Sequence, residues 1–342
     1  MKNPKGKIQS GILTGFVLAV AIGAGVVAFF LFDASDTKSK LAPEYKYDIE
    51  PYAKIDPGLI IYEQIGEAIG IDFDKTTAIA IGADGQIHIA GDEKVVIYEP
   101  DFSAAKTIEL GADPTCVGID SDAKIVICVE NSIIFMDSMG VETARWIVPA
   151  NNAILTSIAT DKTNVFVADA VNKFIWRFDR AGKIVGKIGQ KDPDRNIPGI
   201  VIPSAYFDIA AYPDGLLRVV NPGRHWIEAY TVEGDREWYW GTSGVDIVGF
   251  SGCCNPVALA ILPDGGFVTA EKGLVRVKVY DADGEFIGVV AGPDQLGWIE
   301  PLRVCKTPAE CKAKGFDLAV DGRGRIYVLD TLRNVVRVFE KK

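Results

Sequence analysis

The feature that most constrains this chain is a short unit that recurs six times along it. In each copy an apolar strand leads into a turn, a second apolar strand follows, and an acidic or Asn residue ends the unit. Self-similarity of this kind predicts one repeat architecture rather than several unrelated domains. The copies are AIAIGADGQIHIAGD (78–92), CVGIDSDAKIVICVE (116–130), SIATDKTNVFVAD (157–169), DIAAYPDGLLRVVN (208–221), ALAILPDGGFVTAE (258–271) and DLAVDGRGRIYVLD (317–330).

Further short strands follow each copy, and four strands in roughly 45 residues are typical of a β-propeller blade. We therefore expect an all-β, six-bladed propeller over residues 58–342. The last copy lacks a fourth strand, and the segment 59–65 is expected to supply it, which closes the ring and removes its exposed edges. The equivalent turn positions are Gly85, Ala123, Thr163, Gly215, Gly265 and Gly324.

Two copies resemble NHL repeats, through VADAVNKFIWRFDRAGKIVGKIG (167–189) and VLDTLRNVVRVFE (328–340). The resemblance implies a propeller over roughly 58–340. It is weaker in the first, second and fifth copies, where the residue after the second strand is shifted or replaced by Glu271. NHL propellers include both catalysts and pure binding modules, so the resemblance leaves function open. The residues at the positions usual for the repeat are Asp169, Asn172, Phe178 and Gly182.

An uncharged apolar segment, residues 8–32, precedes the repeats and is long enough to cross about 30 Å of hydrocarbon. Lysines precede it and acids follow it, so the positive-inside rule places Met1 in the cytoplasm. A cleaved signal peptide is the alternative, but its apolar core is usually shorter. We expect a cytoplasmic tail (1–7), a single-pass anchor (8–32) in an inner or cytoplasmic membrane, a tether (33–57), and a propeller on the periplasmic or extracellular side.

Small residues recur on one face of the predicted anchor, at Gly11, Gly15, Ala19 and Gly23. This spacing lets two transmembrane backbones approach closely, which favours docking on another membrane protein, although Gly and Ala are also common in any membrane helix. The first 32 residues carry three lysines and no acid, so the net charge of −10 becomes −13 for the rest of the chain. An acidic exterior body is repelled by anionic lipid, and it disfavours a nucleic-acid partner.

Long insertions are expected to gather on one face of the propeller. The insertions at 190–207, 241–257 and 292–316 all lead into innermost strands, which begin at the same end of every blade. Long loops on a rigid scaffold usually carry function, and aromatic residues among them favour a partner interface. The predicted binding face for other membrane subunits comprises Arg224, His225, Trp226, Trp240, Cys253, Cys254, Asn255, Glu271 and Trp298.

All six cysteines follow the predicted anchor, and an even number in an oxidising space favours disulfides. Cys305 and Cys311 flank a five-residue loop, and Cys116 faces Cys128 across one hairpin, so both pairs are disulfide candidates. For the adjacent Cys253 and Cys254 three interpretations stay open. They are a vicinal disulfide, pairing with other cysteines or burial as thiols, and a soft-metal site shared with Cys116.

Residues for catalysis are sparse. The chain has only two histidines, too few for the zinc site of NHL-like amidating lyases, and it lacks a nucleophile elbow, a phosphate loop and an HExxH segment. Asp208 and Asp317 begin innermost strands, where an oxygen-ligand Ca²⁺ site would lie, but the other four equivalent positions carry no acid. The sequence therefore favours an interaction or scaffold module of a membrane complex, without cofactor or catalytic residues. The alternatives are a Ca²⁺- or Zn²⁺-dependent hydrolase or lyase at the central channel and a small-ligand sensor.

Overall fold

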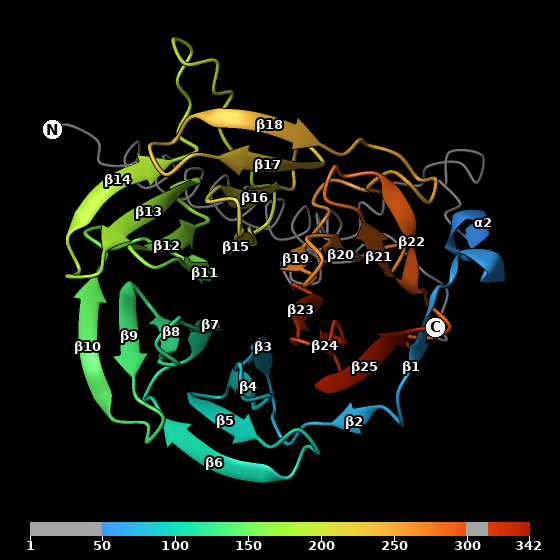
Figure 1. Cartoon of the computed structure of the whole chain (residues 1–342), viewed down its shortest axis with the longest axis horizontal. Coiled ribbons are helices and arrows are strands. Elements are labelled where there is room, and N and C mark those ends of the chain that lie inside the picture. Colours follow the sequence, from blue (N-terminus) through green and yellow to red (C-terminus); the bar gives the residue numbers. More distant parts are fainter. Residues whose placement is uncertain (1–49, 299–313) are drawn as a thin grey trace, which may run out of the picture. The chain divides into compact units, whose positions relative to one another are not determined.

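The computed structural model describes residues 50–298 and 314–342. These residues form six antiparallel sheets arranged as blades around a central axis (Figure 1). The first strand of each blade in sequence lies nearest the axis, apart from the closing strands described below. The predicted all-β six-bladed propeller is therefore confirmed.

Five blades follow one another along the chain, each with its strands in order from the centre outward. The first is β3 (Thr76–Ile81), β4 (Ile87–Gly91), β5 (Lys94–Tyr98) and β6 (Ala104–Glu109), and the second is β7 (Pro114–Ile119), β8 (Ile125–Val129), β9 (Ser132–Met136) and β10 (Glu142–Ile147). The third is β11 (Leu155–Thr160), β12 (Asn164–Asp169), β13 (Phe174–Asp179) and β14 (Ile184–Ile188). The fourth is β15 (Ile209–Ala211), β16 (Leu217–Asn221), β17 (Trp226–Tyr230) and β18 (Arg236–Trp240), and the fifth is β19 (Ala258–Ile261), β20 (Phe267–Glu271), β21 (Arg276–Tyr280) and β22 (Phe286–Ala291).

The sixth blade joins the two ends of the propeller. Its strands β23 (Phe316–Val320), β24 (Ile326–Asp330) and β25 (Val335–Lys341) are completed by β1 (Tyr62–Gln64) and β2 (Ile69–Gly70), which both pair with β25. Between β1 and β2, the Ile65 N–H donates to the Val338 carbonyl oxygen at 2.8 Å. The prediction that segment 59–65 supplies the missing strand is confirmed.

The innermost hairpins have the predicted turns, with one exception. The turn glycines have positive φ, and Ala123 takes the same left-handed conformation, at φ 59°, without being glycine. In the third blade the turn is shorter, and the Asp161 carboxylate accepts hydrogen bonds from the Thr163 and Asn164 N–H groups at 2.6 Å each. The repeat therefore tolerates a side-chain cap in place of a left-handed residue.

The hydrophobic core extends between neighbouring blades. One cluster combines Ile97 of the first blade with Ile127 of the second, both almost inaccessible to solvent. Between the fourth and fifth blades the Trp240 ring centroid lies 5.4 Å from that of Phe267 and 4.5 Å from that of Tyr280. Burying a large apolar side chain contributes about 1.5–3 kcal/mol, so contacts between blades hold the ring together.

Two short helices, α2 (Glu50–Ala53) and η2 (Pro57–Leu59), precede β1. The Arg276 guanidinium of the fifth blade donates to the Tyr52 carbonyl oxygen at 2.7 Å, so this segment contacts the propeller. Within residues 50–298 and 314–342, no helix is both long and apolar enough to cross a membrane. The predicted tail, the anchor with its stripe of small residues, and most of the tether lie outside the described residues.

Candidate functional site

Three long loops lie on one face of the propeller, here called the long-loop face. They lead into β15, β19 and β23, and their described residues are 189–208, 241–257, 292–298 and 314–315. Because successive antiparallel strands alternate in direction, the links between second and third strands end on the same face. The opposite face, here called the hairpin face, carries the tight turns between the other strands.

In four blades the residue at the end of the second strand, or directly after it, anchors the loop that leads into its own blade. Asn221 Oδ1 accepts the Val201 N–H at 2.9 Å, and a Glu271 carboxylate oxygen accepts the Ser251 N–H at 2.8 Å. The acidic or Asn residue at the end of the repeat is therefore a loop anchor. The other examples are Asp169 with the Ile154 N–H (3.4 Å) and Asp92 with the N–H groups of Asp74 (2.6 Å) and Lys75 (2.8 Å).

The 241–257 loop is held by charged side chains that are buried beneath it. Lys278 Nζ donates to the Gly249 carbonyl oxygen at 2.8 Å and forms an ion pair with Glu271 at 2.7 Å. The Arg276 guanidinium donates to the Val245 carbonyl oxygen at 2.7 Å. The side chains of Lys278 and Glu271 are 0% exposed, so both charges depend on these contacts.

Burial of these two cations is unfavourable, and it changes their pKa values. Burial lowers the pKa of Lys278 from its ordinary value, although the Glu271 carboxylate acts in the opposite direction. Burial also lowers the pKa of Arg276. The ion pair and the carbonyl contacts offset this desolvation, and together they fix the loop backbone at several points.

Cys253 and Cys254 lie within this loop and are free thiols, with their sulfur atoms 3.8 Å apart. Cys253 is exposed and Cys254 is buried. Partial burial and the adjacent Cys254 raise the pKa of the Cys253 thiol. Beside them the Asn255 amide donates to the Ser251 carbonyl oxygen at 2.6 Å and to the Lys272 carbonyl oxygen at 2.8 Å, which holds the backbone on both sides.

The link between β16 and β17 borders the cysteine loop. His225 Nε2 lies 2.7 Å from the Gly252 carbonyl oxygen and so ties the two segments together. The Trp226 ring centroid lies 4.3 Å from that of the half-exposed Tyr239, and the Arg224 guanidinium lies 5.3 Å from the Trp226 ring. Cysteine loop and aromatic cluster therefore form one continuous part of the long-loop face.

Three of the predicted binding residues are used mainly in packing. Trp240 packs between two blades, and Glu271 is inaccessible in its ion pair with Lys278. Trp298 is partly buried, with the Arg333 guanidinium 4.2 Å from its ring centroid. Sequence position alone placed these residues near the face but did not give the direction of their side chains.

Large aliphatic side chains are exposed on the long-loop face. Among the described residues, five of them are at least 39% exposed at this face, Met139 and Val141 are exposed in one turn of the hairpin face, and Ile147, Val185 and Ile287 are exposed on the outermost strands β10, β14 and β22. Scattered exposed aliphatic residues are ordinary, but a grouping on one face is typical of an interaction surface. The five are Ile154, Val171, Val201, Val248 and Leu332.

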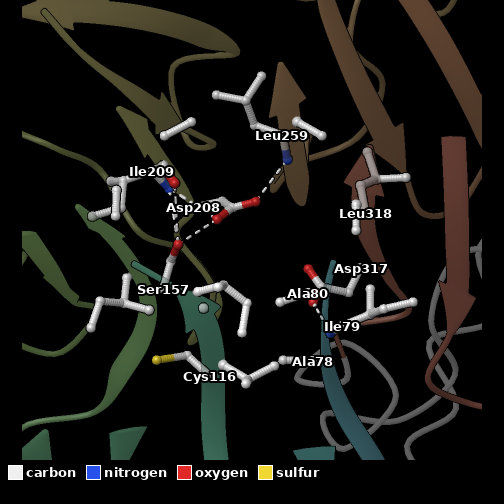
Figure 2. Close-up of a pocket in the computed structure, with 18 of the residues that line it drawn as sticks. Ala78, Ile79, Ala80, Cys116, Ser157, Asp208, Ile209, Leu259, Asp317 and Leu318 are labelled. Atoms are coloured by element: carbon white, nitrogen blue, oxygen red, sulfur yellow. Dashed lines mark hydrogen bonds between the residues drawn. The ribbon is translucent and has the colours of Figure 1, made fainter. Parts of the chain in front are cut away.

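The central channel contains a cavity of about 330 Å³, lined mainly by small and aliphatic side chains of the innermost strands. Figure 2 shows Asp208 between Ser157 and Leu259, where its carboxylate accepts the Ser157 hydroxyl at 2.6 Å and the Leu259 N–H at 2.7 Å. The Asp317 carboxylate accepts the Ile79 N–H at 2.8 Å. Both acids therefore link innermost strands of neighbouring blades.

Lys314 supplies a cation beside these acids, with Nζ 2.6 Å from Asp317 Oδ1. Burial lowers the pKa of Lys314, but Asp317 and Asp208 outweigh it and the net shift is upward. Burial raises the pKa of Asp208, and Lys314 opposes this. The two candidate Ca²⁺ ligands are thus engaged by backbone N–H groups and an ammonium. In the part of the chain that the structure describes, no group of three or more His, Cys, Asp or Glu side chains could hold a metal ion.

The Cys116–Cys128 disulfide is confirmed, and it joins directly paired residues of β7 and β8. A metal site that includes Cys116 is therefore wrong, because its sulfur is already bonded. Cys305 and Cys311 lie outside the described residues.

Sequence reasoning missed Arg276, Lys278 and Lys314. A signal for the first two was present, because VRVKVYD places both cations on one side of an apolar strand at the two-residue period of a sheet. Lys314 stands only three residues before Asp317, just before β23, and one lysine near one acid is no specific signal of a buried ion pair. Buried cations next to loop carbonyl groups are therefore recognisable only in part from sequence.

No protein-family model matches the sequence, and no curated protein matches it. Solved structures share the fold. A streptogramin B lyase structure is 12% identical over 82% of this chain and 98% of its own, with a TM-score of 0.55. A structural genomics protein of unknown function from Bacteroides thetaiotaomicron is 14% identical over 82% of this chain and 76% of its own, with a TM-score of 0.56. The WD40 propeller domain of Doa1 is 13% identical over 78% and 79%, with a TM-score of 0.52. The class of protein is thus a β-propeller, here with six blades.

Proposed function

We propose that this protein is a membrane-anchored, extracytoplasmic propeller of the NHL type that acts as an interaction or scaffold module. In this proposal the long-loop face docks on another subunit of a membrane complex, and the anchor helix packs beside a partner helix. The anchor, its orientation and the NHL resemblance come from the sequence. The observation that carries the docking role is that, in the described part of the chain, five exposed aliphatic side chains lie on the long-loop face, against two on the hairpin face.

The rigidity of this face also supports docking. Lys278, Arg276, Glu271 and Asn255 hold the 241–257 loop through its backbone, so its shape exists before a partner binds. A preorganised surface loses little conformational entropy on association, and more of its contact energy remains as affinity. Trp226 with its neighbouring arginines resembles the aromatic and cationic composition of interface hot spots.

Site-specific photo-crosslinking in native membranes tests the proposal. A photoreactive amino acid at Val248 or Leu332 should give a discrete crosslinked product with one membrane protein, since both side chains are exposed on the long-loop face. The same probe at Met139, which is 70% exposed on the hairpin face, is the matched control and should give no such product. Equal products from both faces, or none from Val248 and Leu332, would refute docking through this face.

A second candidate function is small-ligand binding in the channel, which the cavity of about 330 Å³ favours. A ligand in that cavity should raise the melting temperature of the wild type without turnover. The variant Ala80→Phe fills the cavity and should abolish the shift, because Ala80 lines its wall. A shift that persists in this variant would exclude the channel as the site. A metal-dependent hydrolase has less support, because Lys314 already pairs with Asp317.

A further inference from the structure

We propose that Cys253 and Cys254 form a binding site for a soft, thiophilic metal ion of the Cu⁺ class on the long-loop face. Both cysteines are free, their sulfur atoms lie 3.8 Å apart, and Cys253 is exposed. Thiolate ligands select Cu⁺ over hard cations such as Ca²⁺ or Mg²⁺. This inference concerns a different chemistry from the docking role and stands without it.

The separation of the sulfur atoms suits one shared ion. Metal–thiolate bonds are about 2.3 Å long, and two such bonds that meet at a roughly tetrahedral or trigonal angle place their sulfurs about 3.8–4.0 Å apart. The two thiols already lie at 3.8 Å, so an ion can bind both without a change in the backbone. A vicinal disulfide would instead need a sulfur separation of about 2.05 Å.

The surrounding loop favours the metal over the disulfide. Asn255 fixes the backbone directly after the pair through Ser251 and Lys272, and His225 fixes the residue before it through the Gly252 carbonyl oxygen at 2.7 Å. A backbone held on both sides resists the movement of nearly two ångströms that disulfide closure requires. The same restraint keeps both sulfurs at the distance that a shared ion needs.

The binding step is balanced without an oxidant. Each thiol loses its proton to solvent as a sulfur–metal bond forms, so one ion replaces two protons and no electron is transferred. Disulfide formation would instead release two electrons and would need an acceptor. Because Cys253 is exposed, the remaining coordination positions of the ion face solvent, where water, a small thiol or a partner side chain can complete them.

The test uses the full chain in detergent under anaerobic conditions, with ascorbate to keep copper reduced. Cu⁺ supplied as its bicinchoninate complex should be withdrawn by the protein with one ion per chain and a sulfur-to-copper charge-transfer absorption band. Cys253→Ser and Cys254→Ser should each weaken the Cu⁺ affinity by at least about 100-fold. Removing a residue that only orients a metal ligand already costs about 10–100-fold in affinity, and removing the ligand itself should cost more. Their melting temperatures without metal show whether the variants are folded.

A matched control removes two other sulfur atoms. The double variant Cys305→Ser/Cys311→Ser should keep full Cu⁺ affinity and the same absorption band. Loss of binding in this control, failure of the wild type to take up Cu⁺, or unchanged affinity in both single variants would overturn the proposal. Mass spectrometry of the native protein that shows Cys253 and Cys254 joined as a disulfide would also overturn it.

Discussion

At the scale of single residues, the unusual feature is the number of charges placed out of solvent. Lys278 and Glu271 are inaccessible, and Lys314 and Asp317 are nearly so. Isolated charges in such positions would be strongly unfavourable, and pairing makes them tolerable without making them an efficient source of stability. Their contacts with loop carbonyl and N–H groups indicate what they provide, which is a fixed backbone at the long-loop face.

Lys278→Met should destabilise the propeller by about 3–5 kcal/mol, because the Glu271 carboxylate then remains buried without its counter-ion. Denaturant unfolding of the wild type and the variant measures the difference. The matched control is the double variant Lys278→Met/Glu271→Gln, in which the amide oxygen still accepts the Ser251 N–H and no charge is left unpaired. The double variant should recover much of the loss; if it is no more stable than the single variant, the ion pair is not the cause.

Lys314→Met should make the folding stability of the propeller increase as the pH falls. Lys314 lowers the pKa of Asp208 against burial and Asp317, so its removal raises the Asp208 pKa further. An acid whose pKa is higher in the folded chain binds its proton preferentially there, so stability increases as pH falls through that pKa toward the ordinary value near 4. The deficit in melting temperature relative to wild type should therefore shrink as the pH is lowered from neutral toward the ordinary carboxyl pKa of about 4.

Asp208→Asn in the Lys314→Met background is the control for this effect. The amide cannot titrate, so the deficit relative to wild type should no longer change over the same pH range. A pH dependence that survives the asparagine substitution would assign the effect to another group. A constant deficit in Lys314→Met itself would show that the Asp208 pKa does not respond to Lys314.

At the scale of elements, one repeat position explains most of the architecture of the loops. The residue that ends the second strand is Asp, Asn or Glu in four blades. Glu271, the longest, reaches Ser251 in the 241–257 loop, whereas Asn221 holds Val201. Glu271 in the fifth copy therefore serves as a loop anchor, as Asn221 does in the fourth.

The closing strands can be tested by removing one hydrogen bond. Ile65→Pro deletes the N–H that donates to Val338 of β25 at 2.8 Å, and an unpaired carbonyl at this seam should cost about 1–3 kcal/mol. Ile65→Ala keeps the donor and serves as the control for the lost side chain. The proline variant should unfold at lower denaturant concentration than the alanine variant. Equal stability of the two would show that the Ile65 bond does not hold the ring closed.

Elements with local patterns were predictable from sequence, and contacts across long loops were not. The hairpins follow from two-residue periodicity and turn residues such as Gly85, and ring closure follows from the need to cover the edge of β25. The direct pairing of Cys116 with Cys128 follows from hairpin symmetry. By contrast, Lys278 meets Gly249 only through the path of an irregular loop, and the burial of Lys314 beside Asp317, three residues further on, depends on the place of both residues at the channel. No period in the sequence encodes such a path.

At the scale of the whole molecule, the two faces of the propeller differ in chemistry. The long-loop face carries five exposed aliphatic side chains and the dithiol, counted over the described residues. The hairpin face carries Met139 and Val141, and nearly every one of its turns contains an aspartate that caps its own backbone, as Asp281 does for Asp283 and Glu285. Asymmetry of this kind orients a docked body, because the long-loop face offers more exposed aliphatic side chains to a partner than the hairpin face does. The orientation matters only if the propeller stands outside the cytoplasm, as the sequence of the first 32 residues predicts.

The Cys116–Cys128 disulfide offers a direct reporter for that location. The bond forms in an oxidising compartment and is disfavoured in the cytoplasm, so the full chain expressed in a bacterium should carry it in oxidised form. Replacing Lys2, Lys5 and Lys7 with Glu removes the positive charge that retains the tail inside, and should leave part of the chains with a cytoplasmic propeller and two reduced thiols. Acid trapping, unfolding and alkylation, followed by mass spectrometry of the peptides that contain Cys116 and Cys128, measures the ratio of the reduced to the oxidised pair.

The variant Cys116→Ser/Cys128→Ser controls for labelling of other cysteines. A reduced pair in the wild type, or an unchanged ratio after the charge reversal, would contradict the predicted orientation.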